Sequence, residues 1–306
     1  MAERIGFVGV GFMGHGMAKN LVEKGHPLTI MGHRNRAPVD DLIKRGAKEA
    51  KSAEDVAKNS DIVFLCVTGS PQVEALVRGA NGLAAGAQKG MIIVDCSTSN
   101  PTSTVALAAE LQAKGIFFCD APLGGTPAQA EEGKLSALVG CDASIWPRLE
   151  PIVGKWAAKA VRIGNPGDGH KMKLIMNFLS MGYAAIYSEA LSVGKKVGLT
   201  PQMIDSGLRG SRMDCGFYQT FFDYVLNRNR EAHKFTISNA HKDVRYLAIM
   251  AATAGVPNPV GNAVKDYFAM AEAAGRGQDF VPMLSDFVAE MNGVSLAPQT
   301  GKQAAE

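Results

Sequence analysis

The sequence predicts an α/β protein in which an N-terminal doubly wound sheet is followed by an all-helical C-terminal domain, the two joined by a long helix. Short apolar runs alternate with helical patterns through the first half of the chain, as the β-α units of a parallel sheet require. A glycine-rich turn follows the first run, and from Lys171 onward the pattern is helical with no convincing strand. Because 306 residues suit two domains of about 150 residues each, we expect a sheet domain over residues 1–165, a helical domain over 166–294 and a disordered tail over 295–306.

The composition is that of an ordinary globular enzyme, with 46% hydrophobic and 20% charged residues. A net charge of +3 is too small to indicate a nucleic acid or membrane partner. The cysteines form no C-x-x-C pair and several lie in apolar runs, which predicts buried thiols in a reducing compartment and hence a cytoplasmic protein. The histidines show no H-x-x-x-H or H-E-x-x-H spacing, so no metal site is expected.

The apolar stretch at residues 174–193 is about as long as a membrane span. However, it contains Asn177, Ser180 and Glu189, and two lysines precede it. These polar groups favour a helix buried in a bundle over a membrane span.

Five strands are expected in the first domain, each a short apolar run. Continuous apolar runs are typical of strands that helices cover on both faces. The expected strands are residues 4–8, 28–31, 62–67, 91–94 and 116–119, and the expected helices include 12–24, 105–114, 171–197, 203–208, 237–254 and 262–274.

The turn after the first strand carries a dinucleotide-binding pattern. Gly9-Val10-Gly11-Phe12-Met13-Gly14 matches G-x-G-x-x-G, follows a strand and opens a helix, which is the context that makes this hexapeptide informative. The first glycine permits the tight turn, the second lets the backbone approach a pyrophosphate, and the third allows the helix to pack closely on the strand. The helix N-terminus adds N–H donors and a positive dipole end. We therefore predict a Rossmann domain whose cofactor contacts these six residues.

The end of the second strand favours NADP over NAD. An NAD enzyme usually has an acidic residue there, which accepts hydrogen bonds from the ribose hydroxyls. The expected position is Gly32, and no acidic residue follows until Asp40. His33, Arg34 and Arg36 come instead, and the two arginines are suited to bind a 2′-phosphate. A solvated basic turn without a role is the alternative.

Four further segments matter: two follow predicted strands, one opens the long helix and one lies within a later helix. They are Asp95-Cys96-Ser97-Thr98-Ser99-Asn100-Pro101, Asp120-Ala121-Pro122-Leu123-Gly124-Gly125-Thr126, the stretch from Gly167 to Asn177, and His241-Lys242-Asp243. Together with the glycine-rich turn, they resemble the β-hydroxyacid dehydrogenase family, which includes 3-hydroxyisobutyrate dehydrogenase and tartronate semialdehyde reductase. The resemblance runs in order from about residue 4 to residue 292. It implies an enzyme that interconverts a small β-hydroxy acid and its semialdehyde with a nicotinamide cofactor.

The resemblance implies that Lys173 is the catalytic lysine. Reducing an aldehyde requires a hydride on carbon, which the nicotinamide provides, and a proton on oxygen, which a lysine in a closed cleft can donate. Asn177 lies four residues on, hence on the same helical face, and is a candidate to hydrogen-bond the lysine or the substrate. Taken alone, a lysine at a helix start is more often a surface residue, and Lys171 points to a different face.

Further cofactor contacts are implied by the same resemblance. Val67 and Thr68 should line the cofactor, although the family usually has Leu-Pro at this pair. Ser97 and Thr98 should approach the nicotinamide. Lys242 matches the lysine of the family's Lys-Asp-Leu motif, which reaches the active site and the cofactor, whereas a lysine on a helix is by itself more often solvated.

The implied substrate segment departs from the family pattern. The family commonly reads Asp-x-Pro-Val-Ser-Gly-Gly, where the serine and the following backbone bind the substrate carboxylate; Gly124 stands at the serine position. The sulfolactaldehyde reductases, a branch with Gly-Arg-Thr there, use the arginine on a sulfonate, and this chain has Gly125 instead. Backbone N–H groups around Gly124 and Gly125 and the hydroxyl of Thr126 remain candidates to hold an anion. Met176 replaces a family asparagine, so we expect a substrate that is larger or less charged than 3-hydroxyisobutyrate.

Two alternatives to this enzyme remain. An imine reductase-like enzyme of the same fold and a non-catalytic NADP-binding partner protein usually lack the catalytic lysine, so Lys173 with Asn177 argues against both. The apolar helix at residues 174–193 needs more cover than one small domain provides, which predicts a homodimer or homotetramer. The expected partners are therefore NADP, a small-molecule substrate and further copies of the chain.

Overall fold

The computed structural model describes residues 2–297, which form two compact units. The first unit ends at Lys173 and the second begins at Leu174, so the division falls within one long helix, α9 (Asp168–Lys196). Each unit has its own hydrophobic core. The tail predicted over residues 295–306 lies largely outside the described residues, from 298 onward. Leu296 is buried in the core of the second unit, so the tail prediction is wrong at this position.

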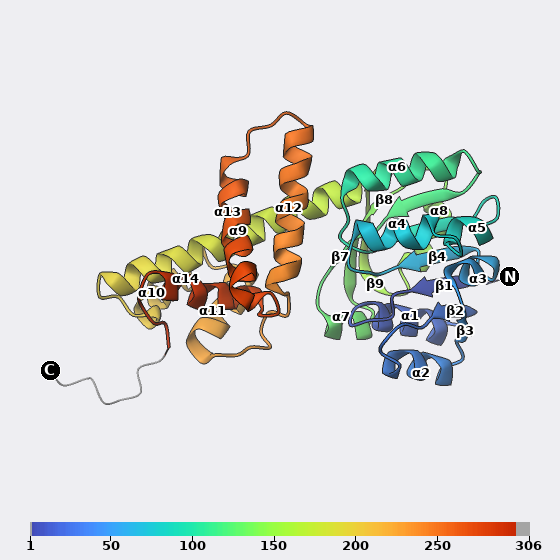
Figure 1. Cartoon of the computed structure of the whole chain (residues 1–306). Helices are drawn as coiled ribbons and strands as arrows, with labels where there is room; N and C mark the ends of the chain where they lie inside the picture. Colours follow the sequence, from blue (N-terminus) through green and yellow to red (C-terminus); the bar gives the residue numbers. More distant parts are fainter. Residues whose placement is uncertain (1, 298–306) are drawn as a thin grey trace. The chain divides into compact units, whose positions relative to one another are not determined.

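The first unit is built on one mixed sheet (Figure 1). Its strands are β1 (Ile5–Val8), β2 (Leu28–Met31), β3 (Lys48–Ala50), β4 (Ile62–Leu65), β5 (Ile92–Asp95), β6 (Phe117–Asp120), β7 (Leu123–Gly124), β8 (Leu135–Gly140) and β9 (Ala157–Gly164). Their order is β3-β2-β1-β4-β5-β6-β8-β7, with β9 paired to β8. Neighbours from β3 to β6 are parallel, as predicted. The expectation of a parallel sheet is wrong beyond β6, because β8 runs antiparallel to both β6 and β7.

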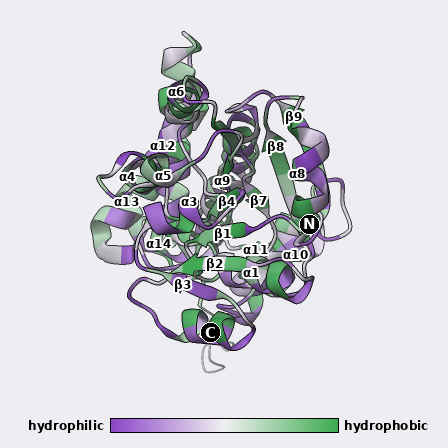
Figure 2. Ribbon diagram, turned by 90° about the vertical axis from the view of Figure 1, so that its right-hand side faces the viewer, coloured by the Kyte–Doolittle hydropathy of each residue, from purple (hydrophilic) through white to green (hydrophobic). Residues whose placement is uncertain are grey.

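Helices cover both faces of this sheet. They are α1 (Gly14–Glu23), α2 (Ala37–Lys44), α3 (Ala53–Lys58), α4 (Ser70–Arg78), α5 (Leu83–Gly86), α6 (Pro101–Gln112), α7 (Pro127–Glu131) and α8 (Trp146–Val153). Ile62 and Phe64 of β4 belong to a core shared with α1, α2 and α8, whereas Val63 and Leu65 belong to a core shared with α3 to α6. Burial on both faces explains why the central strands are mostly apolar, as Figure 2 shows for β1 and β2.

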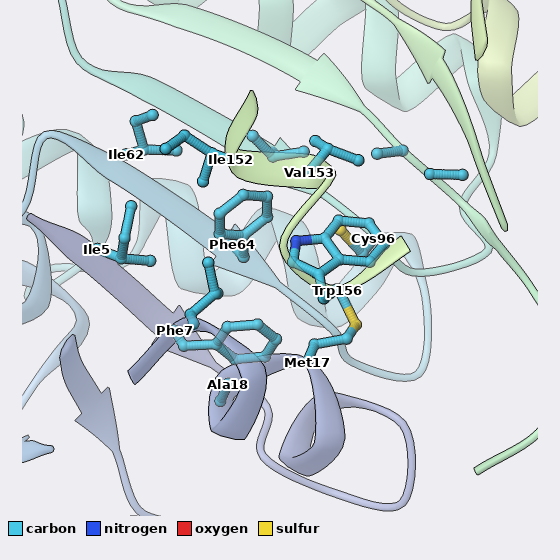
Figure 3. Packing of buried hydrophobic residues seen from close by; sticks show 14 of the residues in the cluster. Ile5, Phe7, Met17, Ala18, Ile62, Phe64, Cys96, Ile152, Val153 and Trp156 are labelled. Atoms are coloured by element: carbon cyan, nitrogen blue, oxygen red, sulfur yellow. The ribbon is translucent and has the colours of Figure 1, made fainter. Parts of the chain in front are cut away.

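An aromatic cluster lies at the centre of the first of these cores (Figure 3). The ring of Phe64 meets Trp156 edge-on, with centroids 5.9 Å apart, and stacks on Phe7 at 6.1 Å. All three side chains are fully buried. Because Trp156 directly precedes β9, the cluster ties the last strand to β1 and β4.

The second unit is helical, as predicted. After α9 it contains α10 (Pro201–Leu208), α11 (Gly216–Asn227), α12 (Ile237–Thr253), α13 (Pro259–Ala271), the short helices η1 (Glu272–Arg276) and η2 (Val281–Met283), and α14 (Leu284–Met291). Tyr187 of α9 contacts Phe217, Tyr218, Phe221 and Phe222 of α11 through its ring. This aromatic contact holds α9 against α11.

Across residues 2–297, no helix combines the length and the apolar character that crossing a membrane requires.

Replacing Phe64 by Ala should lower the free energy of unfolding of the first unit by about 3–5 kcal/mol, because the cavity cannot collapse between two other buried rings. Urea unfolding followed by tryptophan fluorescence measures this, since Trp146 and Trp156 both lie in that unit. Ile43→Ala on α2, where the side chain is 38% exposed, is the control and should cost less than about 1 kcal/mol. Equal losses from the two variants would contradict a central role for the cluster.

Candidate active site

The turn between β1 and α1 leaves open space at one glycine and none at the other two. Gly9 has a φ of 96°, and a side chain there would collide with the carbonyl oxygen of Cys66. A side chain on Gly14 would collide with the carbonyl oxygen of Gly9. An added Cβ at Gly11 has no neighbour within 4 Å. Gly9 and Gly14 are therefore needed by the fold, whereas Gly11 keeps a cradle open beside the N-terminus of α1, as a bound pyrophosphate requires.

The other residues of this turn differ in what they can offer a cofactor. The side chain of Val10 is buried in the core, so only its backbone can contact a ligand. Phe12 is 89% exposed and Met13, which precedes α1, is partly buried. The turn thus presents backbone and one exposed ring, which fits a dinucleotide.

Of the basic residues after β2, Arg36 is bound by two carboxylates of the same chain. His33 and Arg34 are exposed. Arg36 donates from Nη1 to Oε1 of Glu49 at 2.5 Å and from Nη2 to Oδ1 of Asp40 at 3.0 Å. Sequence reasoning treated Arg36 as available to a phosphate and missed Glu49, because Glu49 lies on β3, a strand that was not predicted.

The loops after β4 and β5 are joined by a buried serine. The hydroxyl oxygen of Ser97 accepts a hydrogen bond from the backbone N–H of Val67 at 3.0 Å. Ser97 is 3% exposed, whereas Thr68 is exposed and Thr98 is partly buried. The structure thus brings the two predicted pairs of cofactor residues together at the carboxyl ends of adjacent parallel strands.

A buried ionisable cluster, unassigned by sequence reasoning, fixes the start of α9. Asp120 accepts N–H groups of Gly167 and His170, both at 2.6 Å. The His170 ring donates from Nε2 to the carbonyl of Ser97 at 3.0 Å and lies 3.7 Å from Asp120 and 3.8 Å from Asp95. Burial is the main cause of the raised pKa of Asp120. Aspartates placed directly after two successive buried strands are the signal that would have found this cluster.

Lys173 is partly buried on α9, three residues after His170. Lys171 is exposed and pairs with Asp168 at 2.8 Å. It lies two residues before Lys173 on α9, hence on a different face of the helix. Lys173 therefore follows directly on the buried cluster that anchors the helix.

In the second unit, Asp243 of α12 joins two of the predicted residues. Its Oδ2 accepts a hydrogen bond from Nδ2 of Asn177 at 2.6 Å, and its Oδ1 lies 3.0 Å from Nζ of Lys242. Asp243 is 1% exposed and the Lys242 side chain 14% exposed. Lys242 also lies over the ring of Tyr246. Lys242 is therefore not the solvated lysine that its position on a helix alone would suggest.

The predicted substrate segment lies at β7 and the start of α7. Gly125 has a φ of 125°, which favours glycine. The hydroxyl oxygen of Thr126 caps α7 by accepting the N–H of Gln129, and the backbone N–H of Thr126 donates to the Gln129 side chain at 2.9 Å. Thr126 thus has a local structural role that sequence reasoning did not include.

Within residues 2–297, no three His, Cys, Asp or Glu side chains are arranged to hold a metal ion.

Comparison with known proteins decides the family. The model for the NAD binding domain of 6-phosphogluconate dehydrogenase matches residues 4–164, and the model for the NAD-binding domain of NADP-dependent 3-hydroxyisobutyrate dehydrogenase matches residues 167–286. The chain belongs to the β-hydroxyacid dehydrogenase family. It is thus an NAD(P)-dependent oxidoreductase of the kind that acts on hydroxy acids and semialdehydes.

Individual relatives agree with this assignment. The 3-sulfolactaldehyde reductase of Escherichia coli (strain K12) is 31% identical over 92% of this chain and 94% of its own length. The 2-hydroxy-3-oxopropionate reductase of the same organism is 32% identical over 82% and 85%. The solved structure of Mycobacterium tuberculosis 3-hydroxyisobutyrate dehydrogenase with L-serine superposes with a TM-score of 0.84 at 23% identity, covering 94% of this chain and 99% of that one. That structure supports the fold: a Rossmann domain followed by a helical domain.

Gly11→Val should weaken binding of the dinucleotide, measured with NADPH, by more than about tenfold with little loss of stability, because its Cβ meets no atom of the protein within 4 Å and the side chain would occupy the cradle. Gly14→Val should instead lower the unfolding temperature, since it collides with backbone. Fluorescence titration with NADPH and thermal unfolding measure the two effects. Unchanged NADPH affinity in a folded Gly11→Val variant would contradict the placement of the pyrophosphate.

Proposed function

We propose that this enzyme uses NADP(H) to interconvert a small β-hydroxy acid and its semialdehyde, with Lys173 as the proton donor and acceptor. The observation that carries the proposal is the position of Lys173 on α9, directly after the buried His170 and Asp120 that fix the start of this helix. A fixed helix start gives the lysine a defined direction, as proton transfer to a bound carbonyl requires.

In the reduction, the nicotinamide supplies a hydride to the aldehyde carbon. The Nζ of Lys173 gives its proton to the carbonyl oxygen, so the product is an alcohol and the lysine is left neutral. Oxidation reverses both transfers. An ammonium near the oxygen also stabilises the negative charge that develops there.

Asn177 and Lys242 are proposed as ligand-contacting residues that Asp243 holds in place. Asp243 binds the amide of Asn177 through one carboxylate oxygen and the ammonium of Lys242 through the other. Because Asp243 is buried, both partners lose freedom before any ligand arrives.

The acid group of the substrate is proposed to bind at Gly124, Gly125 and Thr126. The first two supply backbone without side chains, and the hydroxyl of Thr126 can donate while its oxygen caps α7. This segment offers fewer charged contacts than an arginine or lysine clamp. It therefore supports a substrate that is larger or less charged than 3-hydroxyisobutyrate.

For the cofactor, Arg34 and Arg36 support NADP(H) over NAD(H), since guanidinium groups bind a 2′-phosphate well.

The cysteines support a reducing compartment such as the cytoplasm. Cys96, Cys119 and Cys141 are buried, and burial raises the pKa of the Cys66 thiol to about 12. Protonated, buried thiols are typical of proteins that form no disulfides.

Lys173→Ala should lower turnover of the preferred semialdehyde with NADPH by about 10²–10⁴-fold, while the Kd for NADPH changes less than about threefold. A panel of small semialdehydes and both cofactors tests this by following NADPH or NADH oxidation. Lys171→Ala, at the exposed lysine paired with Asp168, is the matched control and should keep normal activity. NADPH binding without turnover of any semialdehyde by the unaltered enzyme would refute the proposed reaction and favour imine reduction or a binding role.

We also infer that α9 joins copies of the chain into a homodimer or homotetramer. Leu179, Ile186 and Val193 recur every seven residues and are 54%, 58% and 62% exposed. Apolar residues at this spacing form the stripe by which helices pair. A stripe of this kind left in water marks an interface.

Sedimentation velocity at micromolar concentration should therefore show a dimer or a larger species. Ile186→Glu should shift the distribution toward monomer, because a carboxylate in an apolar interface is costly to bury. Lys196→Glu, at an exposed polar position of the same helix, should leave the distribution unchanged. A monomer in the unaltered protein would refute the inference.

A further inference from the structure

The space beside Gly32, at the end of β2, is filled by an ion pair from elsewhere in the chain. A Cβ added at Gly32 would collide with Oε1 of Glu49 and come within 2.8 Å of Nη1 of Arg36. Arg36 holds Glu49 through both nitrogens, at 2.5 Å from Nη1 to Oε1 and 3.0 Å from Nη2 to Oε2. A carboxylate therefore lies where a side chain of residue 32 would begin, although residue 32 itself has none.

The neighbouring strands bring Glu49 to this place. β3 pairs in parallel with β2 so that Glu49 stands opposite Ile30. Residues two apart on a strand share a face, so Glu49 reaches along the face that carries Ile30 toward Gly32. Arg36 comes from the turn before α2, and its Nη2 also donates to Asp40 of that helix at 3.0 Å.

In a Rossmann domain this strand end decides between the two dinucleotides. A carboxylate there accepts hydrogen bonds from the ribose hydroxyls of NAD, whereas an arginine accommodates the 2′-phosphate of NADP. Both kinds of group are present here, and they are bound to each other. The hydrogen bond to Arg36 holds the pKa of Glu49 below its usual range, so Glu49 is charged at neutral pH.

We propose that Glu49 is a specificity-determining residue, whose carboxylate competes with the 2′-phosphate of NADP(H) for the guanidinium of Arg36. The inference rests on the proposed use of a nicotinamide dinucleotide and refines its choice of cofactor. A 2′-phosphate must displace Glu49 from Arg36 and also approach a like charge. NAD(H) meets neither obstacle, and its ribose hydroxyls find an acceptor in Glu49.

The 2′-phosphate of NADP(H) can displace Glu49 from Arg36. The side chains of Arg36 and Glu49 are 50% and 31% exposed, and exposed ion pairs are weak. A phosphate that carries two negative charges offers Arg36 a stronger partner than one carboxylate does. Glu49 therefore moderates the preference for NADP(H) that Arg34 and Arg36 create, and the enzyme should accept both cofactors.

Glu49→Gln should lower the Kd for NADP⁺ by about tenfold, because Arg36 loses one of its two carboxylate partners and a charge that repels the phosphate is removed. The Kd for NAD⁺ should stay the same or rise by up to about threefold. Adenosine 2′,5′-bisphosphate, which carries the phosphate without the nicotinamide, should show the same gain as NADP⁺. Isothermal titration calorimetry measures all three affinities without depending on turnover.

Three further variants separate competition for Arg36 from a general effect of net charge. Arg36→Gln should raise the Kd for NADP⁺. Adding Glu49→Gln to that variant should restore little affinity, because the guanidinium for which Glu49 and the phosphate compete is no longer there. Glu110→Gln is the matched control: Glu110 pairs with Arg78 at 2.8 Å on the same unit, so the net charge changes equally. It should leave the ratio of the NADP⁺ and NAD⁺ affinities within about twofold of the unaltered protein.

The outcomes are distinct. An unchanged ratio in a Glu49→Gln variant that still binds NAD⁺ would overturn the inference and leave the proposed function standing. If Glu49→Gln lowers the Kd for NADP⁺ equally in the Arg36→Gln variant, the inference is also overturned, since the effect then does not depend on Arg36. If Glu49→Gln lowers the unfolding temperature, Glu49→Asp replaces it as the test. Its carboxylate keeps the charge but is too short to hold Arg36 as closely, so its Kd for NADP⁺ should still be lower than that of the unaltered protein. An unaltered protein that binds neither dinucleotide would refute the proposed function and the inference together.

Discussion

Two carboxylates, those of Asp95 and Asp120, are buried where β5 and β6 end, and the neighbouring chain is arranged to satisfy them. Burying a charge without hydrogen bonds costs several kcal/mol, on the order of the whole stability of a domain. Asp95 therefore takes the N–H of Ser97 and the hydroxyl of Ser99. Asp120 takes the N–H groups of Gly167 and His170, which are the free donors of a helix beginning. The first turn of α9 is thereby fastened to the sheet, and the direction of Lys173 depends on that attachment.

The other proposed site residues of the first unit lie at the same edge of the sheet. Parallel strands all end on one side, and β1 and β4 lie side by side at the point where the strand order reverses. Ligands of doubly wound sheets bind at such a point. The glycine-rich turn leaves β1 there, Val67 follows β4 and Ser97 follows β5, with a hydrogen bond between the latter two. His170 extends this set by bonding to the carbonyl of Ser97, so the loops that would carry the cofactor and the helix that carries Lys173 share one network.

The parts of the fold that the sequence predicted are those with a strong local pattern. Strands β1, β2, β4, β5 and β6 are continuous apolar runs because helices cover both faces, and α9 has a long apolar periodicity. Four strands were not predicted. The strands β3 and β9 have exposed polar residues on at least one face, so their pattern is that of a loop. The strand β7 has only two residues, and in β8 the apolar run is short and interrupted by Ser136. Glu49 was missed with β3. The pair between Asn177 and Asp243 joins residues 66 positions apart, and no local rule foretells it.

The proposed substrate segment at β7 and α7 is constrained by the local fold. A side chain at Gly124 would collide with the hydroxyl of Ser136, which donates to the carbonyl of Gly124 at 3.3 Å. A larger residue at position 124 therefore requires Ser136 to move. Thr126 is committed to the cap of α7, and Gly125 adopts a backbone that favours glycine. Because these constraints hold without a ligand, a side chain added at position 124 has to be accommodated by Ser136 on β8. The departure from the family serine at Gly124 is thus coupled to the Ser136 hydroxyl, which has to rotate before position 124 can carry a side chain.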